Sequence, residues 1–224
     1  MQKIFKKVCT PVIVSMVGLG VVQTAFAYDE GDFIVKAGLA VVDPREESGN
    51  VLGNDDGVGV NSDKGVGISF TYMLSDQLGI EVLGALPFTH DVVGTGSLAG
   101  INIGEVKHLP PTISAQYYFP VSHQIQFFVG AGLNYTLFFE EDVDSELKAA
   151  LGTNDVDLEL DSSTGLALQI GADVELSKEL GVSAGIYWVD LETEADVIVG
   201  GATAATVDLE LDPWVYRLNL TYKL

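Results

Sequence analysis

The last stretch of the chain, Trp214 to Leu224, most constrains what this sequence can fold into. Apolar and polar residues alternate there through to the final residue, which predicts a strand with one apolar and one polar face. The apolar row begins at Trp214 and has Tyr222 near its other end. A half-buried strand of a soluble sandwich explains the alternation but does not explain the aromatic residues at both ends. An apolar row with aromatics at both ends is typical of a strand that crosses an outer membrane, so the segment favours a membrane barrel.

The beginning of the chain predicts export. Lysines precede an apolar run from Val8 to Val22, and Ala25 to Ala27 supplies the small residues of a cleavage site. The run has about 15 residues, whereas a membrane-spanning helix needs about 20. We therefore expect residues 1–27 to be a signal peptide and residues 28–224 to form the mature domain. The single cysteine, Cys9, falls within the signal, so no disulfide framework is available to the mature chain.

Charge and hydropathy exclude two further classes of protein. The chain has 32 acidic and 11 basic residues and a formal net charge of −21, a sign that excludes nucleic-acid binding. After the signal no segment is apolar enough for a transmembrane helix. A chain that enters a membrane without one must close its strands into a barrel, because unpaired backbone groups cannot face lipid.

Alternation of this kind recurs along the mature chain and predicts an all-β fold, an eight-stranded antiparallel transmembrane β-barrel. The eight expected strands are Phe33 to Val42, Val66 to Leu74, Leu78 to Phe88, Thr112 to Phe119, Ile125 to Phe139, Gly165 to Leu176, Leu180 to Val189 and Trp214 to Leu224.

The connections sort into two kinds. Short turns are centred on Asp76, Ser122 and Lys178. They alternate with long acidic connections at Asp43 to Asp63, Thr89 to Glu105, Glu140 to Ser162 and Asp190 to Asp212. Short periplasmic turns and long extracellular loops are the outer-membrane pattern, so both ends of the barrel domain are expected on the periplasmic side. A closed barrel has no unpaired edge, and a monomer is expected.

Two features stand out within the long loops. A cap at Asp144 to Glu146, an apolar stripe and then Gly152 predict a short helix. The sequence VDLELD occurs at Val156 to Asp161 and again at Val207 to Asp212, which predicts strands that continue above the membrane. The carboxylates from Asp155 to Asp161 also offer calcium ligands, but the glycine and final glutamate of a helical calcium loop are missing. A solvated acidic rim is favoured, and no metal site is predicted.

Strand parity assigns polar side chains to the periplasmic half of the lumen. Opposite charges in so narrow a space are expected to pair and plug it, because eight strands leave room for little besides side chains. Stabilisation of the barrel alone explains the same charges equally well. The predicted plug consists of Lys36, Glu81, Asp173, Glu175 and Arg217.

Nearer the loops the inward row becomes apolar and includes Leu83, Ala85, Phe138 and Val215. An ion pore needs polar walls throughout, whereas an apolar cup above a charged floor suits a small hydrophobic molecule that gains by leaving water. Such a molecule has to leave sideways into the bilayer. The candidates for this lateral exit are prolines, which lack a donor for the strand ladder: Pro87, Pro110 and Pro111.

Several motifs resemble the outer membrane protein W (OmpW/AlkL) family. They are KHLPPT at Lys107 to Thr112, QYYF at Gln116 to Phe119 and LDPW at Leu211 to Trp214. The resemblance covers essentially the whole mature chain. It implies an eight-stranded barrel with a hydrophobic channel, associated with passage of small apolar compounds and, in some members, with use as a colicin receptor.

The resemblance also implies a constriction. A leucine on the third strand narrows the family's channel, and Leu83 occupies the matching position. Its usual tryptophan partner is replaced by Thr164, which implies a constriction that is wider or differently gated. The family usually ends in phenylalanine, where this chain has Leu224; recognition by the barrel-assembly machinery is expected to survive, because the alternating apolar row remains.

No catalytic residue and no cofactor is predicted. His90 and His108 flank one loop and could face each other as a metal pair or a lipid-modifying site, but histidines at a barrel rim are more often interfacial hydrogen-bonding groups. The first hypothesis is therefore a passive channel for small hydrophobic solutes in the bacterial outer membrane. The alternative is a structural or binding barrel whose acidic loops interact with ions, lipopolysaccharide or protein ligands such as colicins.

Overall fold

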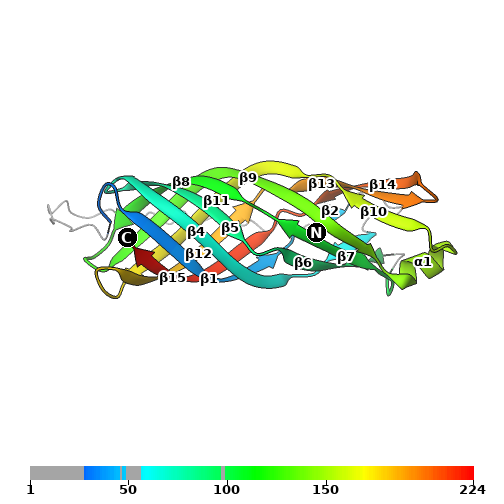
Figure 1. The fold of residues 1–224 in the computed structure, drawn as a ribbon, viewed down its shortest axis with the longest axis horizontal. Helices are drawn as coiled ribbons and strands as arrows, with labels where there is room; N and C mark the ends of the chain where they lie inside the picture. Colours follow the sequence, from blue (N-terminus) through cyan, green and yellow to red (C-terminus); the bar gives the residue numbers. More distant parts are fainter. Residues whose placement is uncertain (1–27, 46, 49–56, 97–98) are drawn as a thin grey trace, which may run out of the picture.

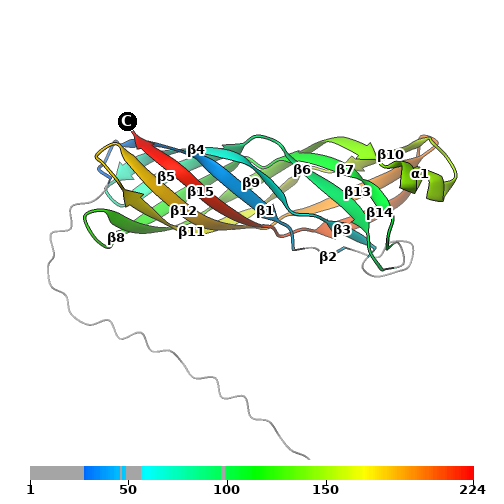
Figure 2. The ribbon, with the colours of Figure 1, turned by 90° about the horizontal axis from the view of Figure 1, so that it is seen from below.

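The computed structural model describes residues 28–45, 47–48, 57–96 and 99–224. The predicted signal peptide, residues 1–27, lies outside the described residues and stays a prediction. The molecule is elongated, with a closed barrel at one end and two sheets that continue from it at the other, as Figures 1 and 2 show. Among the described residues, no helix is both long enough and apolar enough to cross a membrane.

The barrel is eight-stranded, antiparallel and closed, which confirms the predicted fold class. Each strand pairs with the next around the ring, and β9 with β11 closes it. The barrel strands are β1 (Phe33–Asp43), β4 (Asp63–Ser75), β5 (Leu78–Ala85), β8 (Thr112–Pro120), β9 (Ile125–Val143), β11 (Ser163–Glu175), β12 (Leu180–Val189) and β15 (Trp214–Lys223).

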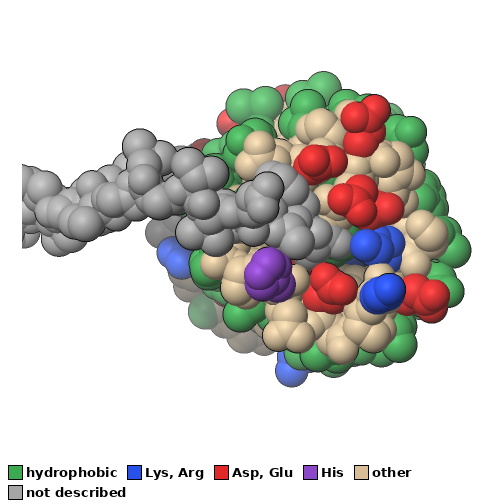
Figure 3. All heavy atoms as spheres, turned by 90° about the vertical axis from the view of Figure 1, so that its left-hand side faces the viewer, with side chains coloured by type: hydrophobic (Ala, Val, Ile, Leu, Met, Phe, Trp, Pro, Cys, Tyr) green, Lys and Arg blue, Asp and Glu red, His purple; other side chains and the backbone are tan. Residues whose placement is uncertain are grey.

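Alternation along β15 sorts its side chains between the two faces of the barrel wall. Leu218 and Leu220 are 57% and 69% exposed on the outside, whereas Arg217, Asn219 and Thr221 between and beside them are buried. Figure 3 looks along the barrel from its short-turn end: hydrophobic side chains line much of the outline, and acidic and basic side chains lie within it. The outward apolar face meets lipid, as an outer-membrane strand requires.

The short turns lie at one end of the barrel, where β15 also ends. Backbone bonds close two of them, from the Val121 amide to the Ile125 carbonyl and from the Leu176 amide to the Leu180 carbonyl. Both are short hairpin connections between neighbouring antiparallel strands, β8 to β9 and β11 to β12. This end of the barrel is periplasmic.

The long connections are more regular than the word loop implies, because two sheets extend the barrel outward. In one, β3 (Val58–Val60), β6 (Phe88–Gly94) and β7 (Asn102–Leu109) join the upper part of β9. In the other, β10 (Val156–Leu160), β13 (Glu192–Val199), β14 (Ala202–Glu210) and β2 (Glu47–Ser48) pair in that order.

The short helix predicted in the third long connection is present as α1 (Ser145–Leu151). The Asp144 side chain accepts a bond from the amide of Glu146 at the N-terminus, and Gly152 ends the helix in the left-handed conformation at φ 72°. The VDLELD repeat forms strands as predicted. Its two copies, in β10 and β14, pair with opposite edges of the same strand, β13.

Candidate functional site

Buried ion pairs form a charged floor near the periplasmic end of the lumen. Lys36 Nζ lies 2.8 Å from Asp173 Oδ2, and Arg217 Nη1 lies 3.8 Å from Glu81 Oε1. These four side chains are at most 4% exposed, so water does not solvate them. The remaining member of the predicted plug, Glu175, is only half-buried and lies at the rim.

Hydrogen bonds extend each ion pair, and a contact between the Tyr28 and Tyr118 rings joins the two groups into one layer across the lumen. Gln169 donates to Glu81 at 3.1 Å and accepts from Gln116 at 2.9 Å. Tyr28 lies beneath and donates through its hydroxyl to Asp173 Oδ2 at 2.9 Å, and its ring meets Tyr118 edge-on. Tyr28 was not predicted from the sequence, because it lies outside every alternating segment. Fully buried polar side chains that bond one another close the lumen at this level.

An inner cavity of about 40 Å³ lies directly above the charged floor. The structure brings Leu83, Ala85 and Val215 together in its wall, with Arg217 beside them and His108 among the residues toward the loops. Its lining is mainly aliphatic, aromatic or proline side chains, and its polar members are Arg217, His108, Thr112, Asn134 and the hydroxyl-bearing Tyr187.

Two of the residues expected to line the channel lie elsewhere. Thr164 is exposed and shares the outward face of β11 with Leu166, while the residues on either side of it, Ser163 and Gly165, are turned inward. It therefore does not stand in the lumen opposite Leu83, and that expectation is wrong because an adjacent residue on a strand points to the other face. Phe138 is half-buried, and the centroid of its ring lies 6.0 Å from that of His108. Its side chain does not line the inner cavity.

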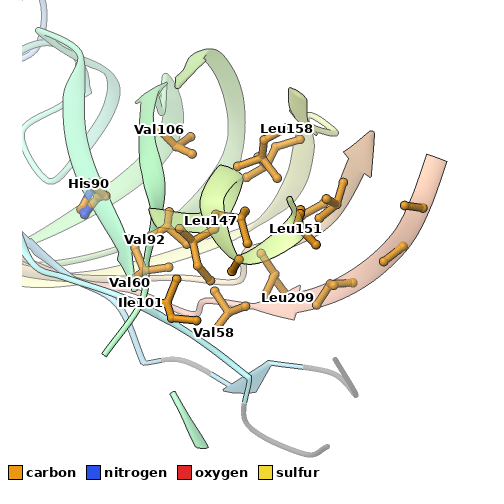
Figure 4. A pocket seen from close by; sticks show the side chains of 18 of the residues that line it. Val58, Val60, His90, Val92, Ile101, Val106, Leu147, Leu151, Leu158 and Leu209 are labelled. Carbon is orange, nitrogen blue, oxygen red and sulfur yellow. The ribbon is translucent and has the colours of Figure 1, made fainter. Parts of the chain in front are cut away.

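A second, larger cavity of about 320 Å³ lies between the two outer sheets and beneath α1, as Figure 4 shows. It lies beyond the barrel and was not foreseen from the sequence. Apart from His90, the lining residues in the part of the chain that the structure describes are all valine, isoleucine, leucine or alanine. The members include Val92, Val106, Leu147, Leu158, Val197 and Leu209.

The alternation of VDLELD explains how this outer cavity forms. In β10 Leu158 is buried while Asp157 and Glu159 are exposed, and β14 repeats the pattern with Leu209 buried between Asp208 and Glu210. The aliphatic rows face the cavity and the carboxylates face water. The same parity, applied to the loops as well as to the barrel strands, was the signal that would have predicted the cavity.

A stack of rings separates the two cavities. His108 lies between Phe88 and His90, with ring centroids 5.5 Å and 4.9 Å away, and it lines the inner cavity while His90 lines the outer one. Burial lowers the pKa of His108 to about 3 and also lowers that of His90, so both rings are neutral near pH 7. The two histidines do face each other, but no group of three metal-ligating side chains occurs in the described part of the chain.

The barrel wall is interrupted at the predicted prolines. Pairing of β5 with β8 ends at Leu83 and Thr112, and pairing of β6 with β7 begins at Phe88 and His108. Pro87 lies in the unpaired stretch of one strand, and Pro110 and Pro111 lie in that of the other. Pro110 and Ala85 line the inner cavity at this height, so the interruption adjoins that cavity.

Comparisons with known proteins agree with this architecture. Residues 29–224 match the model of the OmpW family. Outer membrane protein W of Vibrio cholerae is 41% identical over 203 residues, which are 88% of this chain and 91% of that protein. The crystal structure of the outer membrane protein OprG from Pseudomonas aeruginosa superposes with a TM-score of 0.78 and 35% identity, covering 88% of this chain and 97% of OprG. A dibenzothiophene metabolism operon protein, PahQ of Pseudomonas aeruginosa, is 31% identical over 144 residues, 64% of each chain.

Proposed function

Because this chain belongs to the OmpW family of outer-membrane β-barrels, we propose that it gives small hydrophobic molecules passive passage into the outer membrane. The observation that carries the proposal is the order of the layers: an aliphatic outer cavity, a stack of rings, a mainly apolar inner cavity and a closed charged floor. An apolar solute gains free energy when it leaves water for the first cavity. The floor stops it from continuing into the periplasm.

The exit that this arrangement favours is sideways. The interruption between Leu83 and Phe88 on one strand and between His108 and Thr112 on the next adjoins the inner cavity. Pro87, Pro110 and Pro111 lack the N–H that a strand ladder needs, so separating the wall there breaks few hydrogen bonds. We place the lateral exit at this interruption, with Leu83 as the constriction.

The nature of the solute is also part of the proposal. The relative PahQ is named for dibenzothiophene metabolism, and dibenzothiophene is an apolar ring compound. The aliphatic lining of the outer cavity suits solutes of low polarity. An ion would lose its hydration there without gaining any ligand, so ion transport is disfavoured.

Uptake of a small apolar compound by cells with and without the protein tests the proposal. Leu83 lines the inner cavity, so the larger side chain of Leu83→Trp is expected to fill part of it and to lower protein-dependent uptake several-fold. The neighbouring Val82→Trp is the matched control, because Val82 is 46% exposed on the lipid face and should leave uptake unchanged. Equal uptake with and without the protein would refute transport and favour the alternative, a structural or binding barrel.

The family and fold are those of outer-membrane barrels, which are generally not enzymes, and we propose no catalytic role. The barrel sits among membrane lipids. Lipopolysaccharide, the barrel-assembly machinery and, under the alternative, colicins are proposed partners. We further propose that residues 1–27 are removed on export and that the barrel works as a monomer.

A further inference from the structure

Among the described residues that line the outer cavity, His90 is the only one with a hydrogen-bonding side chain, and it is 5% exposed. It lies at the edge of the aliphatic group, on the side toward the barrel, as Figure 4 shows. A buried polar group in an otherwise aliphatic wall is costly unless it has a partner.

The contacts of His90 fix its hydrogen-bonding capacity. Its Nδ1 lies 2.5 Å from the backbone carbonyl oxygen of Asn61. A carbonyl can only accept, so Nδ1 carries the ring proton, and Nε2 of the neutral imidazole is left as an acceptor. That Nε2 is buried and has no hydrogen-bond partner. Nε2 is thus a hydrogen-bond acceptor to which no group of the protein donates.

The position of His90 puts this acceptor on the path between the two cavities. Its ring stacks on His108 with centroids 4.9 Å apart, and His108 lines the inner cavity. A solute that moves inward must pass these rings. Because Nε2 is inaccessible while the rings are stacked, a contact with it forms as they separate around the solute.

Resting on the proposed function, we infer that the channel selects aliphatic molecules with one hydrogen-bond donor, above all medium-chain alcohols, and that their hydroxyl donates to His90 Nε2. The alkyl chain fills the outer cavity, whose volume of about 320 Å³ suits a small ligand. An alkane or an ether of the same size leaves Nε2 unpaired. A carboxylate has no proton to donate and loses its hydration against aliphatic walls. His90 is therefore a specificity-determining residue.

A matched pair of isomers tests the inference. Heptan-1-ol and hexyl methyl ether have the same formula, but only the alcohol can donate. Binding of each to the full chain in phospholipid nanodiscs is measured by saturation-transfer NMR, and uptake of each is measured with cells. The wild type should prefer the alcohol by about 3- to 10-fold, the range of one neutral hydrogen bond. The alcohol-to-ether preference is compared between the wild type and the variants. The partition of each compound into the nanodisc lipid is the same in all samples and does not affect this comparison.

Two variants at position 90 take the acceptor away from the place of Nε2. His90→Phe keeps a ring for the stack and has no acceptor, whereas His90→Asn keeps an N–H donor for the Asn61 carbonyl and carries its only acceptor, the amide oxygen, on a shorter side chain that does not reach the place of Nε2. Both should bring the alcohol preference close to one while leaving ether binding unchanged. His123→Phe, in an exposed turn at the periplasmic end, is the histidine control and should keep the wild-type preference.

The outcomes separate this inference from the proposed function. If the alcohol and the ether bind equally well to the wild type, or if both variants at position 90 keep the preference, the role of His90 is refuted and transport of apolar solutes stands. If neither compound binds and uptake does not depend on the protein, the proposed function fails as well. Electrophoretic mobility of the unheated protein checks that each variant has folded.

Discussion

At the scale of single residues, the charged floor depends on charged groups that are almost completely buried. Lys36 and Asp173 are 1% and 4% exposed, and the Lys36 ammonium also lies 4.6 Å from the centre of the Phe128 ring. Each charge is tolerable only because the other is present, since an isolated buried charge is far costlier than a buried pair.

Removing one member of this pair should destabilise the barrel strongly. Lys36→Met leaves the Asp173 carboxylate buried beside uncharged neighbours, and we expect a loss of about 3–5 kcal/mol in the free energy of unfolding. The double variant Lys36→Met, Asp173→Leu should recover most of that loss. Urea unfolding of protein folded into phospholipid vesicles measures both. Lys223→Met, at the better-solvated pair with Asp32, should cost at most about 1 kcal/mol. Equal losses at the two pairs would contradict this view of the floor.

A second prediction at this scale concerns pH. Burial, followed by the neighbouring His90, lowers the pKa of His108 from 6.5 to about 3 in the folded protein. Between these values the unfolded chain binds the proton more readily than the folded protein does. The contribution of His108 to the free energy of unfolding therefore decreases as the pH falls from about 6.5 toward 3, and this contribution is constant above pH 6.5. His108→Phe keeps the stacked ring but should remove about 2.6 kcal/mol of this dependence between pH 7.5 and 4.5.

Thermal unfolding at matched pH values checks it. The comparison with the wild type is essential, because this acidic chain carries 32 carboxylate side chains besides its histidines. His123→Phe, in an exposed turn, should retain the wild-type dependence. If His108→Phe responds to pH as the wild type does, His108 does not carry a lowered pKa.

At the scale of whole elements, alternation was sufficient to locate the barrel strands. It failed in the long connections, where β6, β7, β13 and β3 were expected to be loops. Outside the membrane no lipid is present, so strands need neither aromatic belts nor apolar outward faces. The sequence pattern of short strands with acidic outer faces is therefore similar to that of solvated loops. Assigning alternate residues to the lumen correctly predicted that Leu83, Ala85 and Val215 line one cavity. The family resemblance, in contrast, placed Thr164 in the lumen, although its neighbours Ser163 and Gly165 occupy the inward face of β11.

The helix α1 allows a prediction at this scale. Leu147, Ala150 and Leu151 cover the outer cavity, and the Asp144 side chain caps the helix by accepting from the Glu146 amide at 2.8 Å. Asp144→Ala should destabilise this short helix by about 1 kcal/mol and speed amide hydrogen exchange at Lys148 several-fold. Asp144→Ser retains a capping oxygen and should exchange nearly as slowly as the wild type. Equal rates in all three would mean that packing, not the cap, holds the helix.

At the scale of the whole molecule, the proposed function assigns to the order of the layers the choice of solute and of route. The polar floor fills the periplasmic half of the lumen, while the interrupted wall lies at the level of the inner cavity. The described residues therefore leave ions no continuous aqueous path through the barrel, and the route proposed for apolar solutes does not use the floor.

These two routes can be separated by opening the floor. Tyr118 and Phe128 are cross-strand neighbours whose rings lie fully buried in the lumen, 5.6 Å apart. Wild-type protein in planar bilayers should show no ion current, whereas the double variant Tyr118→Ala, Phe128→Ala should conduct. The matched control is the adjacent lipid-facing pair, Phe119→Ala with Phe127→Ala, which should stay silent. Because the proposed exit is lateral, uptake of an apolar solute should change by less than about twofold in the conducting variant. An increase in uptake that parallels the current would instead route the solute through the floor and would contradict lateral release.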